Sequence, residues 1–216
     1  MLQTCIIVNA GEWNGSIMKR HETTPAAAKP SAVRDRILAT ASKLFYRNGI
    51  HAVGVDLVVE ESGIAKTSLY RHFGNKDALV AAFLAAEDVD FWQQWDAIAA
   101  RHAENPVAEL EAYLDWMETR LKRPGYRGCP QLNVVAEIAD PRHPARRVAV
   151  EHKERMLGRL GDIARRLGLS EPESVGARLA LAFDGAFMSA PLGAGERMAV
   201  TLRDSVRALI KAARAD

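Results

Sequence analysis

The sequence predicts an all-α fold, in which a small N-terminal three-helix unit precedes a larger helical domain. Apolar residues recur at three- and four-residue steps from Ser31 almost to the end of the chain, which is the period of amphipathic helices. Glycine or asparagine stands where several of these stripes stop or start, as at helix caps. Hydrophobic residues make up 48% of the 216 residues, which is enough for a packed core and excludes a wholly disordered chain.

Residues 1–30 lack this periodicity and are predicted to form a flexible N-terminal tail. Lys19, Arg20 and Lys29 would bring positive charge toward a polyanion, but a solvated tail is the simpler interpretation. Met18 is an alternative start of translation, which would leave the first 17 residues outside the native protein.

The small unit contains three predicted helices. The first begins near Ser31 and ends at Gly49, because glycine suits a helix C-cap. A short second helix covers the run 55–59 and stops at Gly63; this β-branched run also suits a strand, but its shortness and its helical neighbours favour a helix. The third helix spans about 66–73. The apolar stripe of the first helix consists of Val33, Ile37, Leu38, Ala41, Leu44 and Phe45.

The remainder is predicted to be helical as well. Asn75 can cap one helix, and Asn105 followed by Pro106 is typical of the start of another. Ser170–Glu173 fits a capping box at the start of a third. The six expected helices cover about 75–98, 106–121, 132–138, 145–167, 171–189 and 194–213. The expected division of the chain is a tail (1–30), a helix-turn-helix domain (31–80) and a ligand-binding and dimerisation domain (81–216).

Composition excludes several classes of protein. No apolar run approaches the roughly 18 residues of a membrane span, and the first ten residues carry no positive charge of a secretory signal. Only Cys5 and Cys129 occur, which argues against a disulfide scaffold and favours the cytoplasm. No set of cysteines and histidines has zinc spacing, so neither a metal nor a cofactor is expected. The net charge of +2 is too small to indicate a nucleic-acid binder by itself.

The stretch from Val55 to Lys76 has the spacing of a helix-turn-helix. Gly63 suits the turn because glycine adopts a positive φ at little cost. Ile64 and Leu69 are expected to pack on the first helix, which leaves a polar surface that can hydrogen-bond phosphates and base edges in a major groove. Its residues are Lys66, Thr67, Ser68, Tyr70, Arg71 and His72, with Lys76 at the start of the next helix as part of an anion site. The alternative is the solvated face of a small helical domain.

The run GIAKTSLYRHFGNKDAL at 63–79 and the run ASKLFYRNG at 41–49 resemble the signature of TetR-type transcriptional regulators. The resemblance covers about residues 31–80 and implies a homodimer that binds a palindromic operator in double-stranded DNA. It also implies a small-molecule effector, bound in the larger helical domain. Three features depart from the family pattern: Val53-Gly54 replaces the usual hydroxyl residues, Val59 replaces a small residue, and Ala65 replaces a hydroxyl cap.

The family resemblance implies that the last two helices pair with those of a second subunit. Phe187 and Leu202 are expected in this pairing. Small residues on the first of the two helices would permit close approach, although burial within one subunit explains them as well; they are Gly176, Ala180, Gly185 and Ala186.

Aromatic residues gather in the larger domain and favour a cavity for a flat or apolar ligand, although ordinary core packing explains each of them equally well. The candidate ligand-binding residues are Trp92, Trp95, Trp116 and Phe183. Glu137 and Asp184 lie within apolar segments and are expected to pair with Arg127 or Arg178, or else to bind a cationic or hydroxylated ligand.

The segment Arg127–Pro130 resembles a branch of the family with a cysteine in its regulatory domain, and Arg127 would lower the pKa of the Cys129 thiol. A redox role for this single thiol is the less favoured interpretation, because no second cysteine is near in sequence. His143 and His152 do not have the spacing of a metal pair and are expected to be solvated.

The function predicted from these observations is that of a ligand-responsive DNA-binding transcriptional regulator, a repressor released from its operator by a small molecule. One alternative is an all-helical enzyme, but the sequence has no GxSxG, HExxH or Walker motif and no assigned catalytic residue. Another alternative is a DNA-binding protein that responds to no effector; the length of the C-terminal domain argues against it.

Overall fold

The structure is a computed structural model, and it describes residues 32–214. The predicted tail at 1–30 and the candidate start at Met18 therefore lie outside the described residues. Within the described part the regular elements are nine α-helices and one short 3-10 helix, with no strand. The predicted all-α fold is confirmed.

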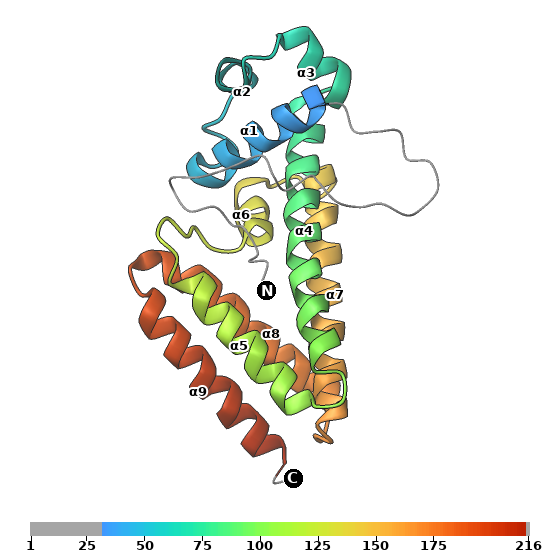
Figure 1. Ribbon diagram of the computed structural model, residues 1–216, viewed down its shortest axis with the longest axis vertical. Coiled ribbons are helices and arrows are strands. Elements are labelled where there is room, and N and C mark those ends of the chain that lie inside the picture. The colour runs from blue at the N-terminus through green and yellow to red at the C-terminus, as the bar shows by residue number, and fades with distance from the viewer. Residues whose placement is uncertain (1–31, 215–216) are drawn as a thin grey trace, which may run out of the picture.

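The three helices of the N-terminal unit are α1 (Ala32–Asn48), α2 (Val55–Ser62) and α3 (Lys66–Phe73). They gather at one end of the long axis (Figure 1). The remaining elements are α4 (Lys76–Arg101), α5 (Pro106–Leu121), α6 (Pro130–Glu137), α7 (Pro144–Arg166), α8 (Pro172–Ser189), η2 (Ala190–Leu192) and α9 (Gly195–Ala213). Helices α4 and α7 run side by side along the axis, whereas α5, α8 and α9 form the opposite end.

Local capping chemistry explains where several helices begin and end. The side chain of Asn75 accepts a hydrogen bond from the Ala78 amide at 2.8 Å, and Asn105 caps α5 in the same way. Gly49 and Gly63 adopt φ angles of 87° and 63° at the ends of α1 and α2. The run 55–59 lies in α2, so the preference for a helix over a strand is confirmed.

The predicted capping box at Ser170–Glu173 is wrong. Glu171 is the N-cap residue of α8, with a φ of 45° and no hydrogen bond from its side chain. The hydroxyl of Ser170 instead donates to the carbonyl of Ala213 at 3.0 Å, and the Glu173 carboxylate pairs with Arg165 at 2.6 Å. Both side chains are drawn to partners on neighbouring helices rather than to the first turn of their own helix.

Two hydrophobic cores meet along α4. The first joins α1, α2, α3 and the N-terminal half of α4 to Val134 and Ile138 at the end of α6 and to Ala145 and Ala149 of α7. The second joins the C-terminal half of α4 to α5, α7, α8 and α9. The N-terminal unit is therefore seated on α6 and α7 as well as on α4. No helix among residues 32–214 is long and apolar enough to cross a membrane.

Phe187 and Leu202 do not lie on an outer face, contrary to expectation. They are 2% and 3% exposed, inside the second core of the same subunit. Gly176 also faces inward, since a Cβ there would lie 2.6 Å from the backbone nitrogen of Gly161 on α7. The small residue permits close approach of α7 and α8 within one chain, which was the alternative explanation. Gly185, in contrast, is exposed and faces no neighbour.

Candidate nucleic-acid interface and internal cavity

Helix α3 is held by two apolar side chains on one of its faces. Leu69 is fully buried and Phe73 is 7% exposed, and both belong to the core that contains Ile37 and Phe45 of α1. Ile64 packs against the same core. These contacts confirm the predicted docking of the second helix of the motif, and they fix which face of α3 is left for solvent.

The predicted DNA-binding residues of α3 lie on that remaining surface. Lys66, Thr67, Tyr70 and Arg71 are exposed, and the Tyr70 side chain is 42% accessible. Ser68 and His72 are partly exposed. Neither N-cap residue, Gly54 of α2 or Ala65 of α3, makes a side-chain cap, as their departures from the family pattern imply.

The two lysines of the predicted site are both engaged. Lys66 forms an ion pair with Asp56 of α2 at 2.6 Å, and the hydrogen bond raises the pKa of this lysine. Lys76 donates from its ammonium to the carbonyl of Ile50 at 2.7 Å, which ties the start of α4 to the connection between α1 and α2. Sequence reasoning placed Lys76 beside free amides, but Asn75 already caps one of them.

The end of α1 is bound to the connection between α5 and α6. The Tyr46 hydroxyl accepts a hydrogen bond from the Arg127 amide at 2.9 Å and donates to the Gly128 carbonyl at 3.2 Å. The Arg127 guanidinium donates to the carbonyl of Arg47. Burial of Tyr46 raises its pKa to about 12, so the hydroxyl keeps its proton at neutral pH.

A second contact joins the turn after α1 to the end of α6. A carboxylate oxygen of Glu137 accepts from the amides of Ile50 and His51 at 2.6 and 3.1 Å. The His51 ring nitrogen Nε2 lies 2.7 Å from the Glu137 carbonyl oxygen. The expected pairing of Glu137 with an arginine is therefore wrong; two backbone amides satisfy the carboxylate. We call these contacts, together with those of Tyr46, the α1 clasp.

The four predicted ligand-binding residues are core residues. Trp92, Trp95, Trp116 and Phe183 are all at most 8% exposed in the second core. The Trp95 ring stacks on Tyr113 with a centroid distance of 4.0 Å, and the Trp92 indole donates to Asp88 at 2.8 Å. Beside them is a small cavity whose walls include other aromatic residues and none of these four.

We call this cavity the inner chamber. Its volume is about 10 Å³, close to that of one water molecule. Its walls come from α4, α5, α6, α7, α8 and the connection between α5 and α6. They are Glu87, Phe91, Arg120, Tyr126, Cys129, Pro130, Gln131, His152 and Phe187.

Burial shifts the pKa values of three groups that line the inner chamber. Burial raises the pKa of Glu87 to about 7, against the opposing effect of the Arg120 guanidinium. Burial also raises the pKa of Tyr126 and lowers that of His152. Arg120 is 4% exposed and lies over the rings of Phe91 and Trp116, at 5.7 and 5.4 Å from their centroids.

An outer groove of about 470 Å³ adjoins the inner chamber. It lies between the end of α5 with the following connection and the segment 190–196 that joins α8 to α9. Tyr126 lines both the groove and the chamber, so this residue lies between them.

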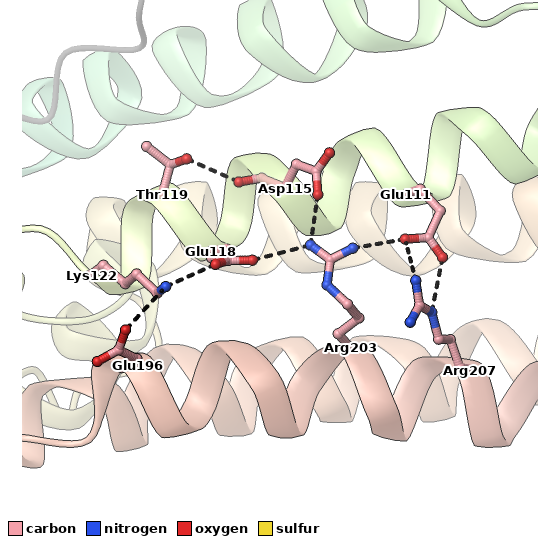
Figure 2. Close-up of polar contacts among 8 residues, drawn as sticks. All are labelled: Glu111, Asp115, Glu118, Thr119, Lys122, Glu196, Arg203 and Arg207. Carbon is pink, nitrogen blue, oxygen red and sulfur yellow. Dashed lines mark hydrogen bonds and ion pairs between the residues drawn. The ribbon is translucent and has the colours of Figure 1, made fainter.

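A ladder of ion pairs joins α5 to α9 (Figure 2). Two of its members, Lys122 and Glu196, line this groove. The Arg203 guanidinium bonds Glu111, Asp115 and Glu118 at 2.7, 2.6 and 3.2 Å. At the groove, Lys122 pairs with Glu118 at 2.8 Å and with Glu196 at 3.5 Å.

Three other predicted polar residues have structural partners. Lys153 pairs with Asp184 at 2.5 Å, so the pairing interpretation holds, although the partner is neither of the expected arginines. His152 is not solvated, because its ring lies 2.6 Å from Asp88 and is 3% exposed. His143 is half-buried and caps α7 through Nδ1. The pairings of Lys153 and His152 join different helices, which the sequence pattern does not reveal.

Cys129 is buried, and its thiol donates to Gln131 at 3.4 Å. The nearby Arg127 guanidinium is directed to the Arg47 carbonyl rather than to the thiol.

Sequence reasoning missed Glu87, Arg120, Tyr126 and Gln131. A signal for the first was present, because Glu87 falls at a helical step between the buried Phe83 and Phe91 of α4. A polar residue inside an apolar stripe indicates a buried polar site.

A short helix with a polar outer face, presented by a glycine turn on a three-helix unit, defines a helix-turn-helix DNA-binding protein. The model of the family described as "Bacterial regulatory proteins, tetR family" matches residues 37–83. The structure is also similar to that of SCO4454, a TetR-family transcriptional regulator from Streptomyces coelicolor, with 30% identity and a TM-score of 0.80. That match covers 84% of this chain and 95% of the other. The chain belongs to the TetR family of transcriptional regulators.

Curated relatives agree with this assignment. The HTH-type transcriptional regulator LmrA of Bacillus subtilis is 25% identical over 139 residues, which is 64% of this chain and 74% of the relative. The uncharacterized HTH-type regulator YxaF of the same organism is 52% identical over 42 residues, but this match spans only 19% of this chain and 22% of the relative.

Proposed function

We propose that the protein is a cytoplasmic repressor that binds a palindromic operator as a homodimer and is released from it by a small molecule. The observation that carries the DNA-binding role is the outer face of α3, where Lys66, Thr67, Ser68, Tyr70, Arg71 and His72 are gathered while Leu69 and Phe73 anchor the helix. Lys76 extends this surface to the start of α4.

An outward face of α8 supports the proposed dimer. Leu181 and Leu192 are 73% and 83% exposed, and Met188 is 39% exposed. Leu181, Gly185 and Met188 follow one another at four- and three-residue steps along one side of α8, and Leu192, four residues further on, lies in η2. Val200 of α9 is also exposed. Pairing of two such faces would cover these side chains, and two recognition helices at a fixed spacing would then read two half-sites.

The proposed control acts through α4 and the α1 clasp. Helix α4 has 26 residues and, at ~1.5 Å per residue, spans roughly 39 Å from Lys76 past Trp92 and Trp95. The clasp holds the end of α1 to the connection that lines the inner chamber. A ligand that displaces either element would change the separation of the recognition helices. A coupling of about 1–3 kcal/mol suffices, and operator DNA must then weaken the ligand by the same factor.

The first test is operator binding across salt concentrations. We expect the DNA immediately upstream of the gene to bind with a steep log–log salt dependence, because phosphate contacts release counterions. A slope near zero would contradict the proposed interface.

Two variants examine the assignment of contacts. Tyr70→Phe and Lys76→Ala should weaken binding to all sequences by a similar factor, since both residues are assigned to the phosphate backbone. A change in base preference in either variant would show that the residue reads bases instead. Circular dichroism of Lys76→Ala is the necessary control, because this lysine also bonds the Ile50 carbonyl.

A further inference from the structure

The inner chamber offers hydrogen-bond donors for which the described residues supply no matching acceptor. Tyr126 is 7% exposed, and its hydroxyl has no hydrogen-bond partner among residues 32–214. Gln131 is 2% exposed, and its amide oxygen already accepts from the Cys129 thiol, which leaves its NH₂ group as the available end. A buried donor without an acceptor costs free energy, so this constellation indicates a group that arrives from outside.

The charge around the chamber favours an anion. Arg120 is buried in its wall, and the adjoining groove is lined by Lys122, Arg123 and Glu196, of which Glu196 pairs with Lys122. Two carboxyls act on Arg120, those of Glu87 and Asp90, and burial raises the pKa of both. The pKa of Glu87, at about 7, lets it hold a proton and act as a further donor. With Glu87 protonated, an incoming carboxylate meets the donors of Tyr126, Gln131 and Glu87 beside the Arg120 cation, and the raised pKa of Asp90 reduces the remaining like charge.

The shape of the two compartments defines how such a ligand would lie. The chamber, at about 10 Å³, has the size of one water molecule as it stands, so a carboxylate head group enters only if the wall at Tyr126 moves. The groove, at about 470 Å³, can hold a larger body. Tyr126 lines both compartments, so a turn of its ring would join the chamber to the groove and make room for the head group. Ala190 and Pro191 give the groove an apolar wall beside its charged residues.

We propose that the effector site of this protein takes an organic carboxylate, whose head group enters the inner chamber past Tyr126 while its apolar body lies in the outer groove. This inference rests on the proposed function in one respect, since it names the chemical class of the effector. The carboxylate binds to the Tyr126 hydroxyl, the Gln131 amide and the Arg120 guanidinium. Glu87 takes up one proton from solvent when the second negative charge arrives.

The proton uptake predicts a pH dependence. The titratable groups that face Glu87 are Asp90 of its own helix, Arg120 of α5, Tyr46 of α1, His152 of α7, and Tyr126 and Cys129 of the connection. Burial lowers the pKa of His152, so this ring is neutral near pH 7. Glu87 is therefore the group that gains or loses a proton there. Affinity for a carboxylate should therefore fall about tenfold between pH 6 and pH 8.

The experiment compares three probes of the same shape and different charge. Phenylpropionate, phenylpropionamide and phenylpropylamine are titrated into the full-length protein by calorimetry, without DNA and in two buffers of different ionisation enthalpy. We expect the carboxylate to bind at least tenfold more tightly than the amide or the amine, with net proton uptake near pH 7. Preference for the amine, equal binding of all three probes, or no binding of the carboxylate would overturn the proposal.

Variants locate the binding in the chamber. Tyr126→Phe should weaken the carboxylate about tenfold, because one charge-assisted hydrogen bond is lost. The matched control is Tyr113→Phe: that hydroxyl already bonds Glu109 and the Trp95 carbonyl outside the chamber, so affinity should change less than twofold. Glu87→Gln should bind the carboxylate without proton uptake. Unchanged affinity in Tyr126→Phe, or persistent uptake in Glu87→Gln, would contradict the assignment.

The two proposals fail separately. If phenylpropionate binds as described but leaves operator affinity unchanged, the carboxylate site stands and its role in releasing DNA is wrong. If a compound releases operator DNA and its affinity is unchanged in the chamber variants, the regulatory role stands and the carboxylate site is wrong.

Discussion

The Glu87 carboxyl links stability to pH because its environment differs between the folded and unfolded chain. Its pKa rises from 4.5 to about 7 in the folded protein. The unfolded chain therefore loses this proton first as the pH rises. The protein has the full benefit of the neutral carboxyl below pH 4.5 and loses up to about 3 kcal/mol as the pH passes through 7.

We predict that Glu87→Gln becomes more stable relative to the wild type as the pH rises from 5 to 8, by up to about 3 kcal/mol. The amide cannot ionise, so the free energy of unfolding of this variant does not fall as the pH rises through this range. Urea unfolding at several pH values measures the difference. Glu61→Gln, at an exposed position of α2, is the control and should show no such trend. Parallel profiles for the wild type and Glu87→Gln would contradict a buried neutral carboxyl.

Both the backbone conformation and the close neighbours of residue 49 favour glycine at this position. Its φ is 87°, and an added Cβ would lie 3.1 Å from a carboxylate oxygen of Glu137. We predict that Gly49→Ala destabilises the protein by about 1–3 kcal/mol. Gly54→Ala is the matched control, because its φ is −79° and no atom lies within 4 Å of the added carbon. Equal unfolding midpoints for the two variants would refute the argument.

At the scale of elements, the α1 clasp joins segments that are about eighty residues apart in sequence. It uses one hydroxyl, Tyr46, and one carboxylate, Glu137, to satisfy backbone groups on the opposite element. Backbone groups that bond to a single side chain are more easily released than those in a helix, which suits the change of this contact in the proposed regulation.

We predict that Tyr46→Phe loosens the connection between α5 and α6 without unfolding α1. The Arg127 amide loses its acceptor and should exchange its hydrogen roughly tenfold faster, which corresponds to about 1.4 kcal/mol. Hydrogen-exchange mass spectrometry of peptides covering 122–130 measures this change. Tyr113→Phe serves as the control, and protection equal to the wild type in Tyr46→Phe would show that the hydroxyl is dispensable.

At the scale of the whole molecule, the proposed dimer depends on the outward face of α8. We predict that Leu181→Glu yields monomers and abolishes tight operator binding, because two carboxylates would be buried without partners and each monomer reads only one half-site. Sedimentation and operator titration provide the measurements. Val89→Glu, on the exposed side of α4, is the matched control, since Val89 is 52% exposed and lies outside this face. An intact dimer in Leu181→Glu would place the interface elsewhere.

Much of the fold was predictable because its signals are local. Helix ends follow from Asn75, Asn105 and the glycines, whose effects act within one turn of the chain. The helix-turn-helix followed from Gly63 and the spacing around it, and the family resemblance rested on the same contiguous residues. The apolar period identified the helices and the aromatic cluster, since periodicity is a property of each segment alone.

The sequence by itself therefore determined the elements, the motif and the family, whereas only the tertiary structure decided which side chains meet. Periodicity marks an apolar face but does not say whether the same chain or a partner covers it, so Phe187 was assigned to the wrong surface. The partners of Glu137, His152 and Asp184 come from other helices, and the inner chamber exists only where five helices and a connection converge. Pairing between distant segments depends on how helices pack, and packing is a property of the whole chain.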